Sequence, residues 1–245
     1  MINLVIDIGN SRTKIALFNQ YDLMFNVPIK HLTVDHVKML KDEHPQLNKA
    51  ILSTVKPADE ELNRFLSENF DFFLELDHQT ALPIENTYET PETLGKDRLA
   101  AAVGANELFP DQNLLIIDAG TAITYDLVSE KNQFVGGNIS PGLEMRFKAL
   151  NHFTGKLPFI SYSDEFQPIG RNTTDAIRAG VQNGIIYEIE QTIDYFNRNY
   201  QKLHIIMTGG DSIFFDKKLN YSIFVNFNLT LIGLNRILEY NAKKK

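Results

Sequence analysis

The stretch VIDIGNSRTKIALF, residues 5–18, runs from a short apolar strand into an aspartate and a Gly-Asn-Ser turn, and then returns as a second strand. An ionised carboxylate at the end of a buried strand is costly unless something pairs with it. Two explanations are open: Asp7 and Gly9 form a simple hairpin turn, or the turn holds a phosphate group or a metal ion. One turn of this kind does not decide between them.

The stretch LLIIDAGTAITYDLV, residues 114–128, repeats this arrangement. Placing Asp118 over Asp7 also places an apolar triplet over an apolar triplet, Gly120 over Gly9 and Thr124 over Thr13. An internal repeat at about half the chain length predicts two related halves. It also favours a pair of phosphate-handling turns over two unrelated hairpins.

Strands alternate with helices in both halves, which is typical of the α/β class. The length of 245 residues suits one large domain or two smaller ones. We expect a first domain over residues 1–112 and a second over 113–245, with the PDQN segment at 110–113 as the boundary.

Composition excludes several classes of protein. The chain has no cysteine, so it has no disulfides, and a cytoplasmic location is expected. The apolar N-terminal run is broken at Asp7, which argues against a signal peptide, and no apolar run is long enough to span a membrane. A net charge of −7 argues against a nucleic-acid partner. Neither a P-loop nor a Rossmann glycine motif is present.

Apolar spacing predicts the remaining elements. Strands are expected at 2–7, 13–18 and 50–54, in a segment that ends in Gly136-Gly137, and in the segment before Gly209. Helices are expected at 60–70, from Arg98, from Pro141 and along 173–196. Residues 229–241 are expected to form a strand and then a helix. The long helix carries an apolar stripe at Ile177, Val181, Ile185, Ile189 and Ile193. Gly180 and Gly184 lie near it and allow another backbone to come close.

Four turns at expected strand ends have the chemistry of a phosphate site. They are Asp7–Lys14, Asp118–Thr124, Gly136-Gly137 and Gly209–Asp211. Glycine lets the backbone approach an anion, and successive N–H groups form an anion-binding concavity. Asn10, Ser11 and Thr121 add neutral donors. The aspartates would hold a cation, which in turn neutralises phosphate charge.

The segment TLGKDRLAAA, residues 93–102, places Asp97 where a turn meets a helix. One interpretation makes Asp97 the N-cap of that helix and Arg98 a surface charge. The other makes both residues part of a functional site.

The ordered motifs of this chain resemble those of the type III pantothenate kinases. They are DIGNSRTK (7–14), LGKDR (94–98) after Tyr88, DAGTAIT (118–124), FVGGNISPGLEMR (134–146), TGKLP (154–158), IGRNTTDAIRAG (169–180) and TGGD (208–211). The resemblance implies an α/β fold of the actin-like ATPase superfamily: two ribonuclease-H-like domains with an ATP cleft between them. It further implies a homodimer that phosphorylates pantothenate with ATP and Mg²⁺, the first step of coenzyme A synthesis, and that requires a monovalent cation, K⁺ or NH₄⁺.

The resemblance also implies a role for individual residues. ATP would be bound by Asp7, Ile8, Gly9, Asn10, Ser11, Arg12, Thr13, Lys14 and Thr121. Pantothenate would be bound by Tyr88, Gly95, Lys96, Asp97, Arg98 and Thr173. Asp97 would accept the proton of the substrate hydroxyl, and Asp118 would help hold the monovalent cation. Arg98 suits an anionic group of the substrate, while Thr173 has a second interpretation as the N-cap of the long helix.

Two rival functions remain open. Another kinase of the superfamily, with a different small acceptor, would keep the nucleotide turns but would leave Tyr88, Gly95–Arg98 and Thr173 unexplained. A nucleotide-binding accessory protein of transcription is the alternative that is not an enzyme. The negative net charge argues against direct DNA binding, and an intact Asp97 argues against an inactive enzyme.

Overall fold

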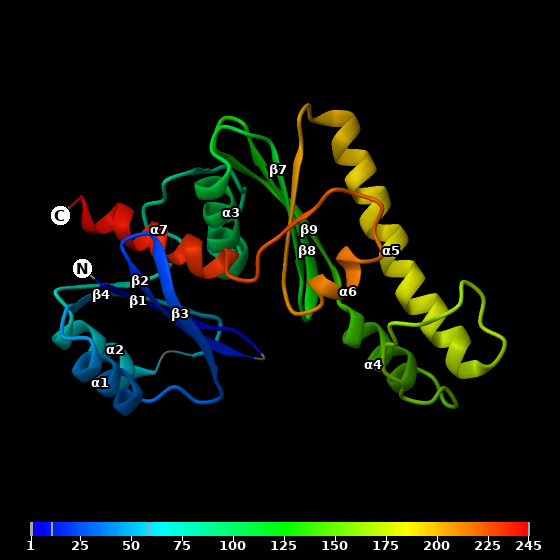
Figure 1. The fold of residues 1–245 in the computed structure, drawn as a ribbon, viewed down its shortest axis with the longest axis horizontal. Helices are drawn as coiled ribbons and strands as arrows, with labels where there is room; N and C mark the ends of the chain where they lie inside the picture. The colour runs from blue at the N-terminus through cyan, green and yellow to red at the C-terminus, as the bar shows by residue number, and fades with distance from the viewer. Residues whose placement is uncertain (1, 11, 58, 245) are drawn as a thin grey trace. The chain divides into compact units, whose positions relative to one another are not determined.

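The computed structural model describes residues 2–10, 12–57 and 59–244, which group into two compact units (Figure 1). Unit 1 is Met1–Pro110, Asn132–Val135 and Asn228–Lys245, and unit 2 is Asp111–Lys131 and Gly136–Phe227. The chain first passes from unit 1 to unit 2 after Pro110, close to the boundary that the sequence suggests at 110–113. The units differ from the expected division because residues 132–135 and the C-terminal segment from Asn228 group with unit 1.

The described part of unit 1 contains a five-stranded sheet in the order β3-β2-β1-β4-β5. Its strands are β1 (Ile2–Ile8), β2 (Thr13–Asn19), β3 (Asp22–Ile29), β4 (Leu47–Thr54) and β5 (Phe72–Glu75). β1 runs antiparallel to β2 and parallel to β4, which places Asp7 between Lys14 and Ser53. The predicted strand pair at the N-terminus is confirmed.

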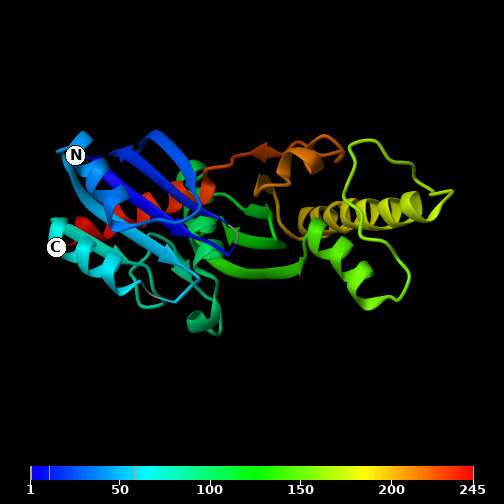
Figure 2. The same ribbon diagram turned by 90° about the horizontal axis from the view of Figure 1, so that it is seen from below.

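Helices cover both faces of this sheet (Figures 1 and 2). Side chains alternate along a strand, so Ile2, Leu4 and Ile6 face α1 (Val34–Glu43) and α2 (Glu60–Asn69) in one apolar cluster. The opposite side chains of β1 face α7 (Leu229–Ala242), which contacts β1 and β4 and packs along α3 (Lys96–Leu108). Asp7 projects on this second face.

Two glycines explain why the C-terminal helix belongs to unit 1. A methyl group on Gly104 of α3 would collide with the carbonyl of Leu229, and one on Gly233 of α7 would collide with the carbonyl of Ala100. The two helices therefore pack with their backbones in close approach. The prediction that the segment begins as a strand is wrong, because residues 229–242 are one helix whose apolar side chains fit this contact.

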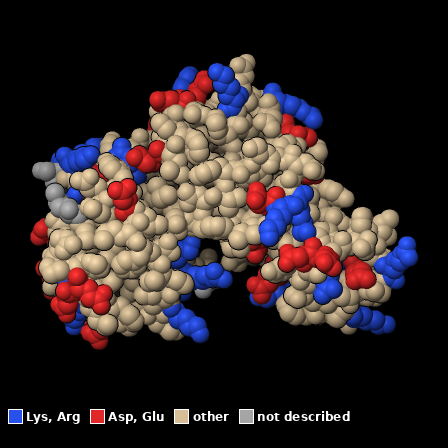
Figure 3. Space-filling view, in the orientation of Figure 1, with Lys and Arg blue, Asp and Glu red and all other residues tan. Residues whose placement is uncertain are grey.

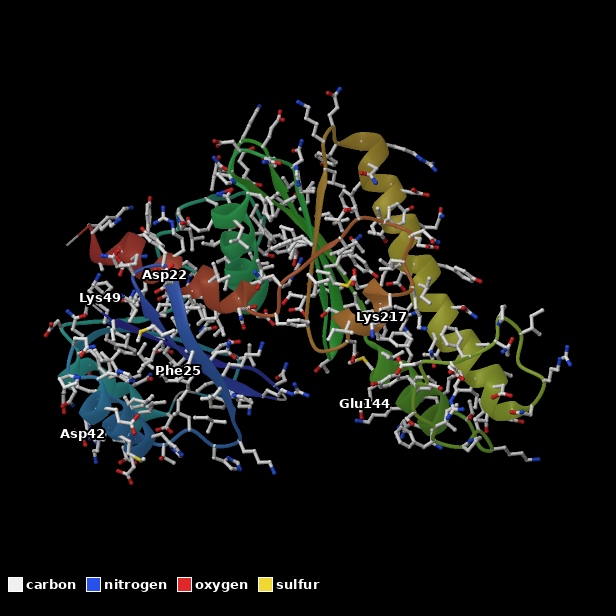
Figure 4. The ribbon with its side chains drawn as sticks, viewed as in Figure 1. Asp22, Phe25, Asp42, Lys49, Glu144 and Lys217 are labelled. Atoms are coloured by element: carbon white, nitrogen blue, oxygen red, sulfur yellow. The ribbon has the colours of Figure 1, made fainter. Side chains whose placement is uncertain are left out.

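Buried polar contacts fasten α7 to the sheet. Asn3 Nδ2 donates to Asn235 Oδ1 and to Glu239 Oε1, each at 2.8 Å, and Lys49 Nζ lies 2.8 Å from Glu239 Oε1. Lys49 is labelled in Figure 4. Burial raises the pKa of Glu239, but the bonds from Lys49 and Asn3 outweigh burial and hold it below its usual value.

The second sheet has the order β11-β10-β7-β8-β9-β6 among the described residues. Its strands are β6 (Glu85–Asn86), β7 (Leu114–Ala119), β8 (Ala122–Ser129), β9 (Gln133–Pro141), β10 (His204–Thr208) and β11 (Phe224–Val225). β7 is antiparallel to β8 and parallel to β10, as β1 is to β2 and β4. The repeated hairpin is therefore confirmed.

The two hairpins differ by one residue. Asp7 lies opposite Lys14, whereas Asp118 lies opposite Thr124. The second turn is thus one residue shorter, and the register partner that corresponds to Thr124 is Lys14 rather than Thr13.

The helices α4 (Leu143–Phe153), α5 (Thr173–Asn199) and α6 (Ser212–Asp216) pack in one apolar cluster with β7, β8 and β10. The predicted stripe of α5 is confirmed, because each of its five apolar residues is buried there. Gly180 and Gly184 are expected to let another backbone come close, and no other described segment of this chain does so: apart from their own turns of helix, nothing lies within 4 Å of a methyl group placed on either.

The expected turn at Gly136-Gly137 is also wrong, because both glycines lie inside β9. A methyl group on Gly137 would collide with the carbonyl of Tyr125 on β8, so glycine is required for the two strands to pair. Gly136 has a φ of 139°, which also favours glycine. The helix after β9 begins at Leu143 and not at Pro141.

None of the helices in the described ranges has the length and apolar character needed to cross a bilayer. On the face drawn in Figure 3, acidic and basic side chains are interspersed over each unit.

Candidate functional site

The end of β1 carries a carboxylate in an unusual environment. Burial raises the pKa of Asp7, Lys14 lowers it, the charge of Asp97 raises it and a hydrogen bond from Ser53 lowers it, with a net value of about 6. Asp97 is near because Asp7 projects on the sheet face that α3 and α7 cover. Ser53 is a neighbour that sequence reasoning missed, and it sits beside Asp7 because β4 runs parallel to β1.

The turn after Asp7 presents backbone and side chains to solvent. Gly9 N–H donates to the Arg12 carbonyl at 3.0 Å, which closes the turn. Asn10 and Arg12 are exposed, whereas Ile8, Gly9 and Lys14 are partly buried. Thr13 is 4% exposed, so its side chain is the least accessible of the predicted ATP ligands described. Ser11 lies outside the described residues.

Asp97 lies in the first turn of α3 but is not its N-cap. Gly95 is the N-cap, and Asp97 Oδ1 accepts a hydrogen bond from the backbone N–H of Arg98 at 2.9 Å. The interpretation of Asp97 as N-cap is therefore wrong. A methyl group on Gly95 would lie 2.6 Å from Asp97 Oδ1, so the carboxylate occupies the space that glycine leaves. Asp97 is exposed and available to a ligand.

Arg98 lies against two aromatic rings. Its guanidinium carbon is 5.7 Å from the ring centre of Tyr88 and 6.0 Å from that of Phe134, in the range of cation–π attraction. Arg98 is 6% exposed, so the interpretation as a surface charge is wrong. Phe134 is fully buried, and its carbonyl accepts bonds from Thr87 N at 3.1 Å and Thr87 Oγ1 at 2.7 Å. Sequence reasoning missed Phe134, which only the β6–β9 pairing brings beside Tyr88.

The second repeated turn has a carboxylate packed between glycines. A methyl group on Gly209 would lie 2.5 Å from Asp118 Oδ1, and one on Gly120 would lie 3.2 Å from the same oxygen. Gly209 has a φ of +96°, which glycine adopts without strain. Thr208 of β10 lies beside Asp118 as Ser53 lies beside Asp7, so each repeat pairs its aspartate with a buried hydroxyl, a relationship that sequence reasoning missed.

Unit 2 contains two more of the predicted binding residues, Thr121 for ATP and Thr173 for pantothenate, and both are exposed. The N-cap of α5 is Asn172, whose Oδ1 accepts from Asp175 N at 2.9 Å, so the interpretation of Thr173 as N-cap is wrong. Across the described ranges, no three side chains of His, Cys, Asp or Glu gather as a metal-binding group.

Comparison with known proteins decides the family. The sequence model of the type III pantothenate kinases matches residues 3–195. The chain belongs to the type III pantothenate kinase family. A type III pantothenate kinase of Phocaeicola vulgatus is 44% identical over 99% of this chain and 100% of its own length. One from Bacteroides fragilis is 45% identical over 98% of both chains.

Solved structures agree on the fold. A candidate Baf family transcriptional activator from Campylobacter jejuni matches with a TM-score of 0.62 and 23% identity, over 98% of this chain and 99% of its own. A candidate N-acetylmannosamine kinase from Listeria monocytogenes matches with a TM-score of 0.58 and 12% identity, over 99% and 100%. The predicted α/β fold of the actin-like ATPases and sugar kinases is thus confirmed for this pantothenate kinase family member.

Proposed function

We propose that this protein transfers the γ-phosphoryl group of ATP to the primary hydroxyl of pantothenate, the first step of coenzyme A synthesis. The observation that carries the proposal is the match to type III pantothenate kinases over nearly the whole chain. The electrostatics of unit 1 agree with it, because the charge of Asp97 raises the pKa of Asp7 at the strand end that leads into the turn closed by Gly9 and Arg12.

The nucleotide is assigned to the two repeated turns. Residues Asp7–Lys14 and Thr121 would contact ATP through backbone N–H groups, neutral donors and the Lys14 cation. The chemistry of the donor set fits a nucleotide with Mg²⁺, because Asp7 is a partly buried carboxylate whose pKa is raised by desolvation and by the charge of Asp97, and a cation would offset both effects. When bound, Mg²⁺ would neutralise phosphate charge.

Asp97 is assigned as the group that accepts the proton of the pantothenate hydroxyl. Its carboxylate is exposed and is held in the first turn of α3. Phosphoryl transfer requires the protein mainly to position the reacting groups and to neutralise charge, so a weak base is sufficient.

Pantothenate is assigned to Tyr88, Gly95, Lys96, Asp97, Arg98 and Thr173. The burial of Arg98 against the rings of Tyr88 and Phe134 means that only a small part of this side chain can reach a ligand. Such a fixed guanidinium would recognise an anionic group of the substrate with little loss of side-chain entropy.

Three further assignments belong to the proposal. Asp118 would help hold K⁺ or NH₄⁺, and the fit rests on its carboxylate, which is packed between Gly120 and Gly209. The protein would act in the cytoplasm as a homodimer whose interface lies near the pantothenate site. Exposed apolar side chains of unit 2, including Ile139 (66%), Phe153 (82%) and Ile169 (79%), favour burial against a second copy.

The test is an acceptor screen with ATP, Mg²⁺ and K⁺. Pantothenate should be phosphorylated at its primary hydroxyl, while hexoses and N-acetylated hexosamines should not react. Phosphorylation of a sugar in place of pantothenate would instead support a superfamily kinase with another acceptor. Absence of any acceptor-dependent ADP release would support the accessory-protein alternative.

A further inference from the structure

A charged hydrogen-bond network lies in unit 2 beside the second repeated turn. Arg146 of α4 donates from Nε to the carbonyl of Pro141 at 2.8 Å and from Nη2 to Ser140 Oγ at 2.9 Å. The same Nη2 lies 2.5 Å from Glu188 Oε2 on α5. The other oxygen, Glu188 Oε1, accepts from the Tyr125 hydroxyl of β8 at 2.8 Å. One guanidinium thus joins the end of β9 to α5 and β8.

The network is largely removed from solvent. Tyr125 is 2% exposed, and the side chains of Arg146 and Glu188 are 21% and 30% exposed. Burial raises the pKa of Glu188, but hydrogen bonds from Arg146, Tyr125 and Ser140 outweigh burial and hold it below its usual value. The pair therefore stays ionised at neutral pH. Charge-assisted bonds of this kind are the strong ones among protein hydrogen bonds.

The segment that Arg146 holds is packed directly against the nucleotide turn. Gly142 N–H donates to the carbonyl of Thr121 at 3.2 Å. A methyl group on Gly142 would collide with the carbonyls of both Gly120 and Thr121. Because the backbones touch here, a shift of residues 140–142 must shift the Gly120-Thr121 turn as well.

We propose that Arg146 and Glu188 are positioning residues for ATP binding, which hold residues 140–142 in place and through them the Gly120-Thr121 turn. The inference rests on the proposed function, in which Thr121 contacts ATP. It assigns a role to two side chains that touch neither the substrate nor the nucleotide. It also explains why Arg146, the fourth residue of α4, turns back to the strand end that precedes its own helix.

The experiment measures ATP binding without pantothenate, by calorimetry, so its outcome does not depend on catalysis. Arg146→Met should raise the dissociation constant for ATP by about tenfold, equivalent to about 1.4 kcal/mol. Glu188→Gln, which keeps the shape and removes the charge, should raise it by a smaller factor. In the acceptor assay, KM for ATP should rise while KM for pantothenate stays within about twofold.

Two control variants separate positioning from loss of an ion pair. Arg236 Nε lies 2.7 Å from Glu107 Oε2 with exposures of 24% and 35%, close to those of the Arg146 pair, but in unit 1. Lys148 pairs at 2.7 Å with Glu144, labelled in Figure 4, on the same helix as Arg146. Arg236→Met and Lys148→Met should leave ATP affinity within about twofold of the wild type.

Each outcome bears on the inference. If Arg146→Met lowers thermal stability like Arg236→Met and leaves ATP affinity unchanged, the network is structural only and the inference is overturned. If Arg146→Met does not fold, Arg146→Lys and Glu188→Gln replace it, and wild-type ATP affinity in both overturns the inference. If the wild type binds ATP but phosphorylates no pantothenate, the proposed function fails while the positioning role is still decided by binding.

Discussion

Asp7, at the end of β1, and Asp97, in the first turn of α3, lie close enough that the charge of Asp97 raises the pKa of Asp7. Two carboxylates that repel each other are unfavourable in the free protein. They become favourable once a cation or a cation–phosphate group lies beside them. The pair therefore indicates a site whose electrostatics are completed by its ligand.

The burial of Asp7 predicts a dependence of stability on pH. The pKa of Asp7 is raised from 3.8 to about 6 in the folded protein, so between these values the folded state binds more protons than the unfolded state. Stability therefore falls as pH rises through that window. Asp7→Asn should raise the free energy of unfolding by up to about 3 kcal/mol at pH 7.5, and by much less at pH 4.5.

Urea unfolding at the two pH values, without nucleotide, measures this difference. An equal effect of Asp7→Asn at both would contradict the assignment of the pKa shift. The same variant should lose ATP-dependent activity at both pH values, because it cannot neutralise a cation.

Gly95→Ala should impair catalysis without unfolding the protein. Gly95 has an ordinary φ of −57°, and the new methyl group would meet the Asp97 carboxylate at 2.6 Å and not a backbone atom. The flexible carboxylate would move, so kcat should fall by about 10-fold or more, with the melting temperature nearly unchanged. Gly155→Ala is a matched control, because no described atom lies within 4 Å of its added methyl group. Wild-type kcat in Gly95→Ala would show that the observed position of Asp97 is not needed.

If Asp118 helps to hold a monovalent cation, as proposed, enzymatic activity should depend on that ion. Activity should be low in sodium-only buffer and should recover with potassium, because the carboxylate would hold the larger ion beside the phosphates. Asp118→Asn should weaken this activation, with circular dichroism as the check that the strand end is intact. Equal rates of the wild type in sodium and in potassium would contradict the predicted dependence on a monovalent cation.

Gly180 and Gly184 locate the expected dimer contact. Glycine inside a helix costs about 1 kcal/mol relative to alanine, and no described atom of the chain uses the space beside either residue. We expect a second copy to use it, so Gly180→Ala and Gly184→Ala should raise the dimer dissociation constant in analytical ultracentrifugation. More stable variants with unchanged dimerisation would place the interface elsewhere, and a fully active wild-type monomer would contradict the dimer itself.

The local pattern of the sequence predicted the repeated hairpins and the stripe of α5, because alternation and four-residue spacing directly reflect which side chains are buried. It predicted α7 only in part. Whether the leucines at 229–234 continue a helix or form a strand depends on the close contact between Gly104 and Gly233, which joins segments far apart in the chain.

The parts of the site whose residues are adjacent in the sequence could be predicted. The parts whose residues come together only through strand pairing could not. The turns at Asp7 and Asp118 are visible as motifs. Ser53 and Thr208 reach those aspartates only through the parallel pairing of β4 and β10. Phe134 reaches Tyr88 only through the pairing of β9 with the two-residue strand β6, whose length gives no periodic signal.

The most direct test of the central claim compares wild type and Asp97→Asn for transfer of the labelled γ-phosphoryl group from ATP to pantothenate, in the presence of Mg²⁺ and K⁺. The account predicts 4′-phosphopantothenate from the wild type and a kcat lower by about 10²–10⁴-fold in the variant, as expected for loss of a general base. ATP affinity should change little, and the loss of stability should not exceed about 1 kcal/mol, the value of a charge in the first turn of a helix. Near wild-type kcat in Asp97→Asn would contradict the role of Asp97, and a wild type that labels no pantothenate would contradict the proposed function.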